Sequence, residues 1–97
     1  MASELPVPLE HSGEIDLILR QVLRDVLGLS SDRVAELDEN SGLFGHLPEL
    51  DSMAVAGLLT ELEDRLDIII EDDDIDGEML ETFGGLLNFL SLKRIER

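Results

Sequence analysis

The sequence contains no cysteine, tryptophan or tyrosine, and each absence excludes something. Without cysteine there are no disulfide bonds and no thiolate metal sites. Three phenylalanines are the only aromatic residues, so the core has to be built from leucine, isoleucine and valine. Uninterrupted apolar runs reach about four residues, far below the roughly 20 residues that a membrane-spanning helix needs. We therefore expect no membrane insertion.

Basic residues are scarce. Seven Lys and Arg stand against 23 Asp and Glu, which gives a formal net charge of −16. Disorder requires high charge together with low hydrophobicity, and a hydrophobic content of 43% argues against it. The length of 97 residues fits one small domain. Its acidic surface should repel nucleic acid and attract basic patches on partner proteins. We expect a monomer with no nucleic-acid partner.

Residues 1–12 contain Pro6 and Pro8 and predict a flexible tail before a folded domain over residues 13–97. The tail lacks the basic and apolar regions of a secretory signal, so we expect a cytoplasmic protein. Ser12 is a suitable N-cap for a first helix, which Gly28 would end. Apolar residues recur along this helix at spacings of three and four, as an amphipathic helix requires: Ile15, Ile18, Leu19, Val22, Leu23, Val26 and Leu27.

The rest of the chain predicts two further long helices. Residues 29–50 are rich in serine, glycine and asparagine and predict a long ordered loop, held by Val34, Leu37, Leu43, Phe44 and Leu47. A second helix should start near Asp51 or Ser52. Residues 67–70 predict an extended connector whose isoleucines enter the core, and 71–78 a turn or short helix. A last helix is expected from Met79 to Leu92. The fold class is therefore all-α, a bundle of three main helices and one short helix.

The stretch LDSMAVAGLL, residues 50–59, places a serine at the head of the second helix. A nucleophilic serine needs a neighbouring base, and the two histidines, His11 and His46, lie in the tail and the loop. We therefore expect no catalytic residue. Asp51 or Ser52 could serve only as an N-cap. Alternatively, Ser52 is a modification site, because the N-terminus of a helix stabilises a phosphate.

The longer stretch LDSMAVAGLLTELEDRLDIII resembles the acyl carrier protein family, and the resemblance extends from about Ile15 to Leu90. It implies a carrier fold in which Ser52 bears 4'-phosphopantetheine, attached by a phosphopantetheinyl transferase. Asp51 and Met53 would flank the attachment point and help to dock that transferase. Acyl cargo would ride on the arm as a thioester, and acyl-loading and acyl-transfer enzymes with basic docking patches would be further partners. D-alanyl carrier proteins share the Asp-Ser-Met form, so an aminoacyl cargo remains an alternative.

The sequence departs from the family pattern just after the serine. Family members commonly have acidic residues on the exposed face there, whereas this chain has Ala54 and Gly57. We expect partners to meet the start of this helix through apolar contacts and its later part through acids, with the recognition residues being Ala54, Val55, Gly57, Leu58, Glu61 and Asp64. The residues expected to line an interior that shelters a fatty chain are Val55, Leu59, Leu62, Ile69, Phe83 and Leu87.

The acidic stretch DDDIDGEMLETF, residues 72–83, partly fits a calcium-binding loop. Asp72, Asp74 and Asp76 occupy the first three ligand positions. The bidentate glutamate of position 12 is replaced by Phe83, which should point into the core. These aspartates are thus a weak metal candidate, and we expect no specific metal site. The alternative from another functional class is an acidic, calcium-responsive adaptor without a covalent cofactor.

Overall fold

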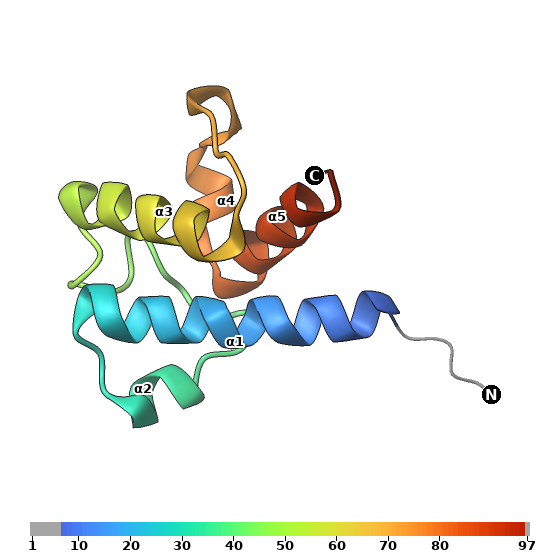
Figure 1. Ribbon diagram of the computed structural model, residues 1–97. Helices are drawn as coiled ribbons and strands as arrows, with labels where there is room; N and C mark the ends of the chain where they lie inside the picture. Colours follow the sequence, from blue (N-terminus) through green and yellow to red (C-terminus); the bar gives the residue numbers. More distant parts are fainter. Residues whose placement is uncertain (1–6, 97) are drawn as a thin grey trace.

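The computed structural model describes the backbone of residues 7–96 and the side chains of residues 13–94. Its elements are all helical (Figure 1), namely α1 (Val7–Leu27), α2 (Ser31–Ala35), α3 (Ser52–Leu66), the 3₁₀ turn η1 (Asp72–Asp74), α4 (Gly77–Glu81) and α5 (Phe83–Glu96). The all-α bundle expected from the sequence is confirmed. In the described part of the chain, no helix is long and apolar enough to cross a membrane.

The first helix is longer than expected. It begins at Val7 rather than after Ser12, so part of the segment expected to be a tail is helical, and residues 1–6 lie outside the described residues. Pro8 falls in the first turn, where a missing backbone N–H costs nothing. The end at Gly28 is confirmed, since its N–H donates to Arg24 O at 2.9 Å and its φ of 74° suits glycine.

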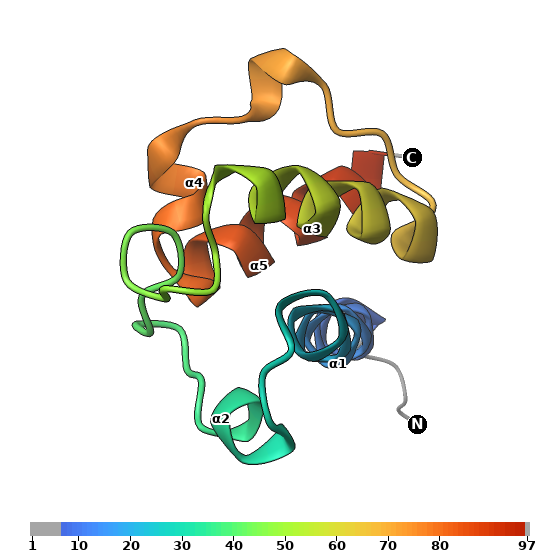
Figure 2. The same ribbon diagram turned by 90° about the vertical axis from the view of Figure 1, so that its left-hand side faces the viewer.

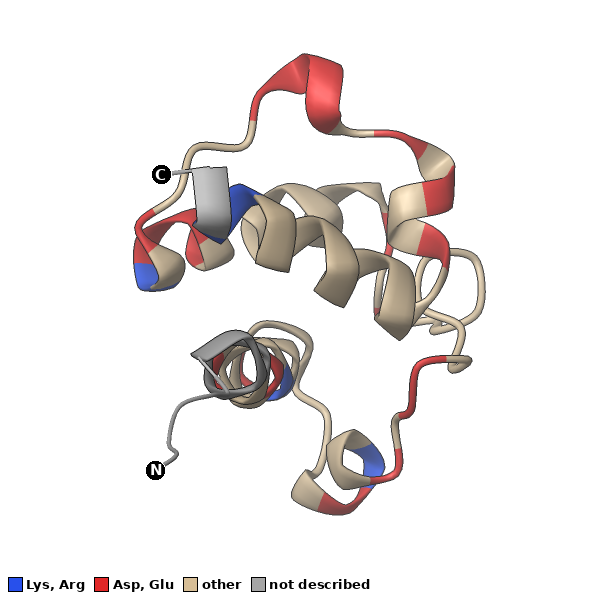
Figure 3. Cartoon of the chain, turned by 90° about the vertical axis from the view of Figure 1, so that its right-hand side faces the viewer, with Lys and Arg blue, Asp and Glu red and all other residues tan. Residues whose placement is uncertain are grey.

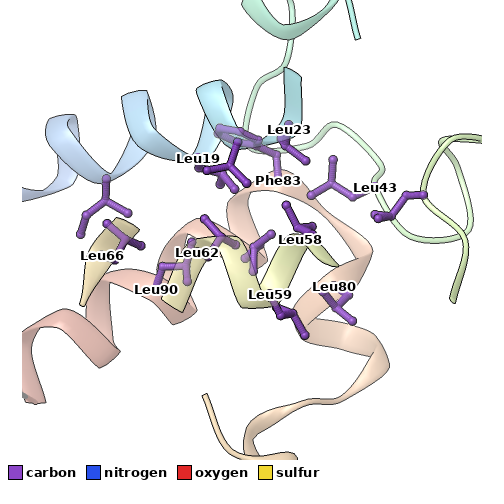
Figure 4. Packing of buried hydrophobic residues seen from close by; sticks show 14 of the residues in the cluster. Leu19, Leu23, Leu43, Leu58, Leu59, Leu62, Leu66, Leu80, Phe83 and Leu90 are labelled. Atoms are coloured by element: carbon purple, nitrogen blue, oxygen red, sulfur yellow. The ribbon is translucent and has the colours of Figure 1, made fainter. Parts of the chain in front are cut away.

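The core lies where α1, α3 and α5 meet (Figure 2). Leucine dominates it, and no polar or charged residue is buried among the described side chains. Phe83, the first residue of α5, is only 1% exposed and points inward as predicted. The Arg20 guanidinium lies over its ring, 4.6 Å from the centroid. Figure 4 shows how leucines of α1 and α3 pack around this ring.

The long segment between α1 and α3 contains a short helix that the sequence pattern did not reveal. Ser30 caps α2 by accepting a hydrogen bond from Arg33 N at 3.1 Å, and Val34 anchors the helix in the core. The Phe44 side chain does not anchor the loop as predicted, because it is 37% exposed. Leu43, which was predicted alongside it, is fully buried.

A backbone ladder holds this segment against the junction between α4 and α5. Gly42 pairs with Thr82 in an antiparallel bridge. Four hydrogen bonds of 2.7–3.0 Å flank it, running from Leu43 N to Glu81 O, from Phe44 N to Leu80 O, from Phe83 N to Ser41 O and from Gly84 N to Glu39 O. Because both strands of the ladder are backbone, sequence periodicity gives no sign of it.

The ladder also explains why the last helix is divided. A single helix from Met79 to Leu92 was expected, but Thr82 has extended dihedrals, φ −128° and ψ 158°. This conformation lets Thr82 pair with Gly42, and it separates α4 from α5. Met79 is buried as expected, although it belongs to α4.

The connector after α3 is extended, as predicted, but a different isoleucine enters the core. Ile68 is 5% exposed, whereas Ile69 is 71% exposed. Successive side chains of an extended backbone point to opposite sides, so Ile68 and Ile70 face inward and Ile69 faces solvent. Ile69 therefore does not line the interior. The connector is held by Glu63 Oε2, which accepts a hydrogen bond from Ile70 N at 2.7 Å.

Replacement of Gly84 by alanine should weaken the ladder. A Cβ atom at Gly84 would lie 2.7 Å from the backbone oxygen of Glu39, a distance at which the two backbones have to separate. We expect Gly84→Ala to reduce the free energy of unfolding by about 1–3 kcal/mol, the usual cost of overpacking, as measured by urea denaturation.

Gly57→Ala is the matched control, because Gly57 also lies in a helix. A Cβ atom there would have only Val26 Cγ1 within 4 Å, at 3.9 Å, so packing against α1 does not require glycine. Alanine should raise the free energy of unfolding by about 1 kcal/mol, from helix propensity alone. Equal effects of the two substitutions would contradict the role of the ladder.

Candidate functional site

Asp51 begins α3 and supplies its N-terminal cap. Its backbone is extended, with φ −95° and ψ −176°. Its Oδ1 accepts a hydrogen bond from Ala54 N at 2.8 Å, and its carbonyl accepts the first helical bond, from Val55 N at 2.9 Å. Of the two cap candidates in the sequence, Asp51 therefore carries out this structural role.

Ser52 is the first residue of α3 and is exposed. In the described part of the chain its hydroxyl makes no hydrogen bond, so the fold leaves it available. The N–H groups of Ser52 and Met53 have no intrahelical acceptor, because the first helical hydrogen bond is donated by Val55 N. Together with the positive end of the helix dipole, they favour a phosphate at this position. Met53, the next residue in the chain, is 85% exposed. The site thus fits an attached phosphodiester.

The chain that leads into Ser52 is held from two sides. Leu50 is 3% exposed and anchors it in the core. Glu49 Oε2 accepts a hydrogen bond from Arg33 Nη1 of α2 at 2.7 Å, and this bond lowers the pKa of the Glu49 carboxyl below its ordinary value of 4.5. Neither contact was predicted. The Arg33–Glu49 bond depends on α2, which the sequence pattern did not reveal. The anchoring role of Leu50 could have been inferred from a leucine placed directly before Asp51.

The residues expected to recognise partners lie in different environments. Gly57 and Asp64 are exposed, whereas Ala54, Val55 and Glu61 are half-buried. The prediction that Leu58 recognises partners is wrong. Its side chain is 0% exposed and lies in the core between α1 and α3 (Figure 4).

Glu61 is engaged within the protein. It pairs with Arg65 at 2.8 Å, and Arg65 also reaches Asp25 of α1 at 3.1 Å. These bonds raise the pKa of Arg65 and lower that of Asp25. Glu61 therefore helps to tie α3 to α1 as well as facing solvent.

The expected interior residues are mostly in the core. Leu59, Leu62 and Phe83 are buried, and Val55 and Leu87 pack partly against the same cluster. With Ile69 removed from this set, the remaining five residues form an apolar surface contributed by α3 and α5. Such a lining would favour an alkyl chain over a charged group.

The acidic stretch does not form a calcium loop. Asp76 Oδ1 accepts a hydrogen bond from Met79 N at 2.7 Å and caps α4. Asp74 Oδ2 accepts from Glu71 N at 3.0 Å and pairs with Lys93 at 2.9 Å. Among the described residues, no group of three or more His, Cys, Asp or Glu side chains could hold a metal ion. Two of the three candidate aspartates therefore have structural roles.

Figure 3 shows that acidic residues gather on η1 and α4. Nine consecutive residues, 52–60, contain no acidic or basic side chain. The acidic charge that could attract a basic partner thus lies on η1 and α4 and at the C-terminal end of α3.

Comparison with known proteins agrees with this geometry. A search of curated proteins found no match, whereas the family model described as a phosphopantetheine attachment site matches residues 18–90. The solution NMR structure of a holo acyl carrier protein from Nitrosomonas europaea is similar, with 38% sequence identity and a TM-score of 0.75. The similarity covers 86% of this chain and 96% of that protein. The chain belongs to the acyl carrier protein family.

Membership of this family confirms the cofactor predicted from the resemblance, a covalently attached 4'-phosphopantetheine. Acyl carrier proteins transport cargo and do not catalyse its reactions, so the prediction that the chain is not an enzyme also stands. The family further implies a phosphopantetheinyl transferase and acyl-handling enzymes as partners. A carrier protein needs from its own side chains only an accessible attachment point and surfaces that enzymes recognise.

The cap should be separable from the attachment chemistry in this carrier protein. Asp51→Ala removes the acceptor of Ala54 N and should lower the free energy of unfolding by about 1 kcal/mol. Asp51→Asn keeps an acceptor oxygen and should change it by only a few tenths of a kcal/mol. Urea denaturation of both variants measures the difference. Equal loss of stability in both would show that Asp51 acts through its charge rather than as a cap.

Proposed function

We propose that Ser52 carries the phosphopantetheine arm and that the protein delivers acyl groups, bound to the arm as thioesters, to partner enzymes. The observation that carries this proposal is the division of roles at the start of α3. Asp51 caps the helix, so the adjacent hydroxyl is exposed and has no structural task within the described chain. A transferase can therefore modify Ser52 without disturbing the fold.

The other described serines support this choice by contrast. Ser30 caps α2, Ser41 bonds with Asp38 and Ser91 Oγ donates to Leu87 O at 2.9 Å. Ser31 is exposed, but it begins a helix of only five residues. Ser52 alone among them combines an exposed hydroxyl with the start of a long helix, here one of 15 residues.

An acyl cargo fits this chain better than a D-alanyl cargo. The core beside α3 is aliphatic, and no polar or charged residue is buried in the described part of the chain. An alkyl chain that entered it would gain roughly 25 cal/mol per Å² of apolar surface removed from water. The ammonium group of an alanyl thioester would find no partner there and would lose its hydration.

Ser52→Ala should abolish attachment of the arm. After coexpression with a phosphopantetheinyl transferase, intact-mass spectrometry should show the wild-type protein heavier by one phosphopantetheine arm and Ser52→Ala without any gain. The free energy of unfolding of unmodified Ser52→Ala should stay within about 0.5 kcal/mol of wild type, as for other surface substitutions.

Ser31→Ala is the matched control, because Ser31 is also an exposed serine at the first position of a helix. It should be modified as completely as wild type. A mass gain on Ser52→Ala, or its loss on Ser31→Ala, would place the arm elsewhere. No mass gain on the wild-type protein, together with a calcium-dependent shift, would favour the adaptor alternative.

We further propose that partners approach the start of α3 through apolar contacts. Its exposed surface carries Met53, Ala56, Gly57 and Thr60, and the acidic side chains that steer a basic partner lie at Asp64 and on η1 and α4. Uncharged contact at the serine and charge beside it would orient the carrier on an enzyme. Fatty acyl synthesis is one pathway that would use such a carrier.

A charge placed on this apolar surface should slow modification. Ala54 is half-buried, so Ala56, which is exposed, is the cleaner position. Ala56→Glu should lower kcat/KM of the transferase by about tenfold, or about 1.4 kcal/mol of binding energy, because the new carboxylate loses water in the contact. Ala35→Glu, an exposed alanine on α2, adds the same charge and should have little effect. An unchanged or faster reaction with Ala56→Glu would argue against apolar contact.

A further inference from the structure

A groove of about 210 Å³ lies between α1 and α2. Leu17 of α1 and Val34 and Ala35 of α2 supply its apolar surface, and Gln21 and Arg24 of α1 are among its polar lining residues. Leu17 is 56% exposed, and Ala35 is exposed as well. The groove therefore offers apolar surface that the fold leaves open to solvent.

The groove lies on the face of α1 that is turned away from the core. Leu17, Gln21 and Arg24 follow one another at spacings of four and three, so they share one face of the helix. Leu19 and Leu23, which are 0% exposed, lie on its other face. Figures 1 and 2 both show α1 between α2 and α3, with α2 and η1 on opposite sides of the bundle. The groove is thus separate from the acidic surface of η1 and α4.

Arg20 holds the two sides of the groove together. Its Nη1 donates a hydrogen bond to Val34 O of α2 at 2.6 Å, and its Nε donates to Asp16 Oδ1 at 2.6 Å. The same guanidinium lies over the ring of Phe83. Because Arg20 is fully engaged within the protein, α2 is fixed against α1 before any partner arrives.

Arg24 and Gln21 are the donors that remain for an occupant. The Arg24 side chain is exposed, and its one contact among the described residues is a long one, from Nε to Asp25 Oδ1 at 3.4 Å. Asp25 also accepts a shorter hydrogen bond from Arg65, at 3.1 Å. The Gln21 amide forms no hydrogen bond within the described part of the chain. A guanidinium only donates, and its preferred partner is a carboxylate.

The lining indicates the charge and size of the occupant. Two arginines and no Asp or Glu line the groove, although acidic residues outnumber basic ones by 23 to 7 in the chain. A net charge of −16 repels a partner that is acidic throughout, so the occupant should carry a single carboxylate among uncharged residues. The volume lies below the roughly 300–1,000 Å³ typical of small-molecule pockets and suits one or two side chains of a protein.

We propose that this groove binds a short, mostly uncharged segment of a partner protein, with an aliphatic side chain against Leu17 and Ala35 and one carboxylate on Arg24. A partner held there leaves the start of α3 and the surface of η1 and α4 exposed. The carrier would then stay bound to one protein while its arm serves others. The groove does not depend on modification of Ser52, so it can be tested on the unmodified chain.

The test uses the full chain, labelled with ¹⁵N, and a synthetic helical peptide of about 15 residues. The peptide consists of alanine and glutamine, has blocked ends, and carries two leucines and one glutamate on one face. Saturable amide shift changes should centre on residues 17–24 and 31–35. A peptide with glutamine in place of the glutamate should bind about tenfold more weakly. Repulsion by the net charge alone predicts the opposite, because the glutamine peptide is neutral.

Matched variants locate the contact. Leu17→Ser should weaken binding about tenfold, whereas Leu92→Ser, at a leucine on α5 that is 53% exposed, should change it less than about twofold. Arg24→Gln should weaken binding of the glutamate peptide more than Arg94→Gln, which removes an equal charge from α5. Arg24→Gln combined with the glutamine peptide should weaken binding no more than either change alone. Dispersed amide spectra verify that each variant is folded.

Four results would overturn the proposal. Shift changes centred on α3 or α4 would place the contact on another surface. Equal or tighter binding of the glutamine peptide would show that Arg24 does not recognise the carboxylate. Equal weakening by Leu17→Ser and Leu92→Ser would show that the apolar contact is not in the groove. The absence of saturable binding would show that the groove holds no such segment.

Discussion

The fold depends on a backbone ladder between residues 39–44 and 80–84. Its four hydrogen bonds and one bridge join the long segment after α2 to the point where α4 ends and α5 begins. The ladder holds Leu43 in the core and turns Phe83 toward α1 and α3. It also fixes the end of the loop that carries the chain to Asp51. It is also the backbone contact that joins the long crossover to α4 and α5.

The functional consequence is that the backbone on either side of Ser52 is held in place while the Ser52 hydroxyl itself has no structural role. Leu50 and the Arg33–Glu49 pair hold the approach, and Asp51 completes the first turn of the helix. All the constraints fall on the neighbours of Ser52. A hydroxyl that stabilised the helix would be costly to modify, because its cap would be lost with the modification. Separate cap and attachment residues remove this conflict, and they explain why adjacent Asp and Ser are useful in this order.

Much of this could be predicted from the sequence, and the failures have a common cause. Apolar periodicity located α1, α3 and α5, and it placed Phe83 in the core. It could not show α2, whose five residues are too short for a period, or the division at Thr82, which backbone pairing imposes. Leu58 was misjudged because α3 is buried over a wide arc, and Ile69 because one residue decides which isoleucine of an extended run faces inward. Local pattern predicted the helices and the end of α1 at Gly28, whereas the break between α4 and α5 is set by pairing with a distant segment of backbone.

Charged and uncharged surfaces are also separated in this protein, as the capping and attachment residues are. The net charge is −16, and several of the few basic residues form contacts that connect one helix to another. Arg20 joins α1 to Val34 of α2 at 2.6 Å, Arg65 joins α3 to α1, and Lys93 joins α5 to η1. The contacts of Arg65 and Lys93 are with the carboxylates of Asp25 and Asp74, so they also neutralise acidic charge. Exposed acidic side chains remain on η1 and α4, whereas residues 52–60 carry no charge. The surface that attracts partners from a distance is therefore different from the apolar surface that they touch at Ser52, so attraction and specific contact can change independently.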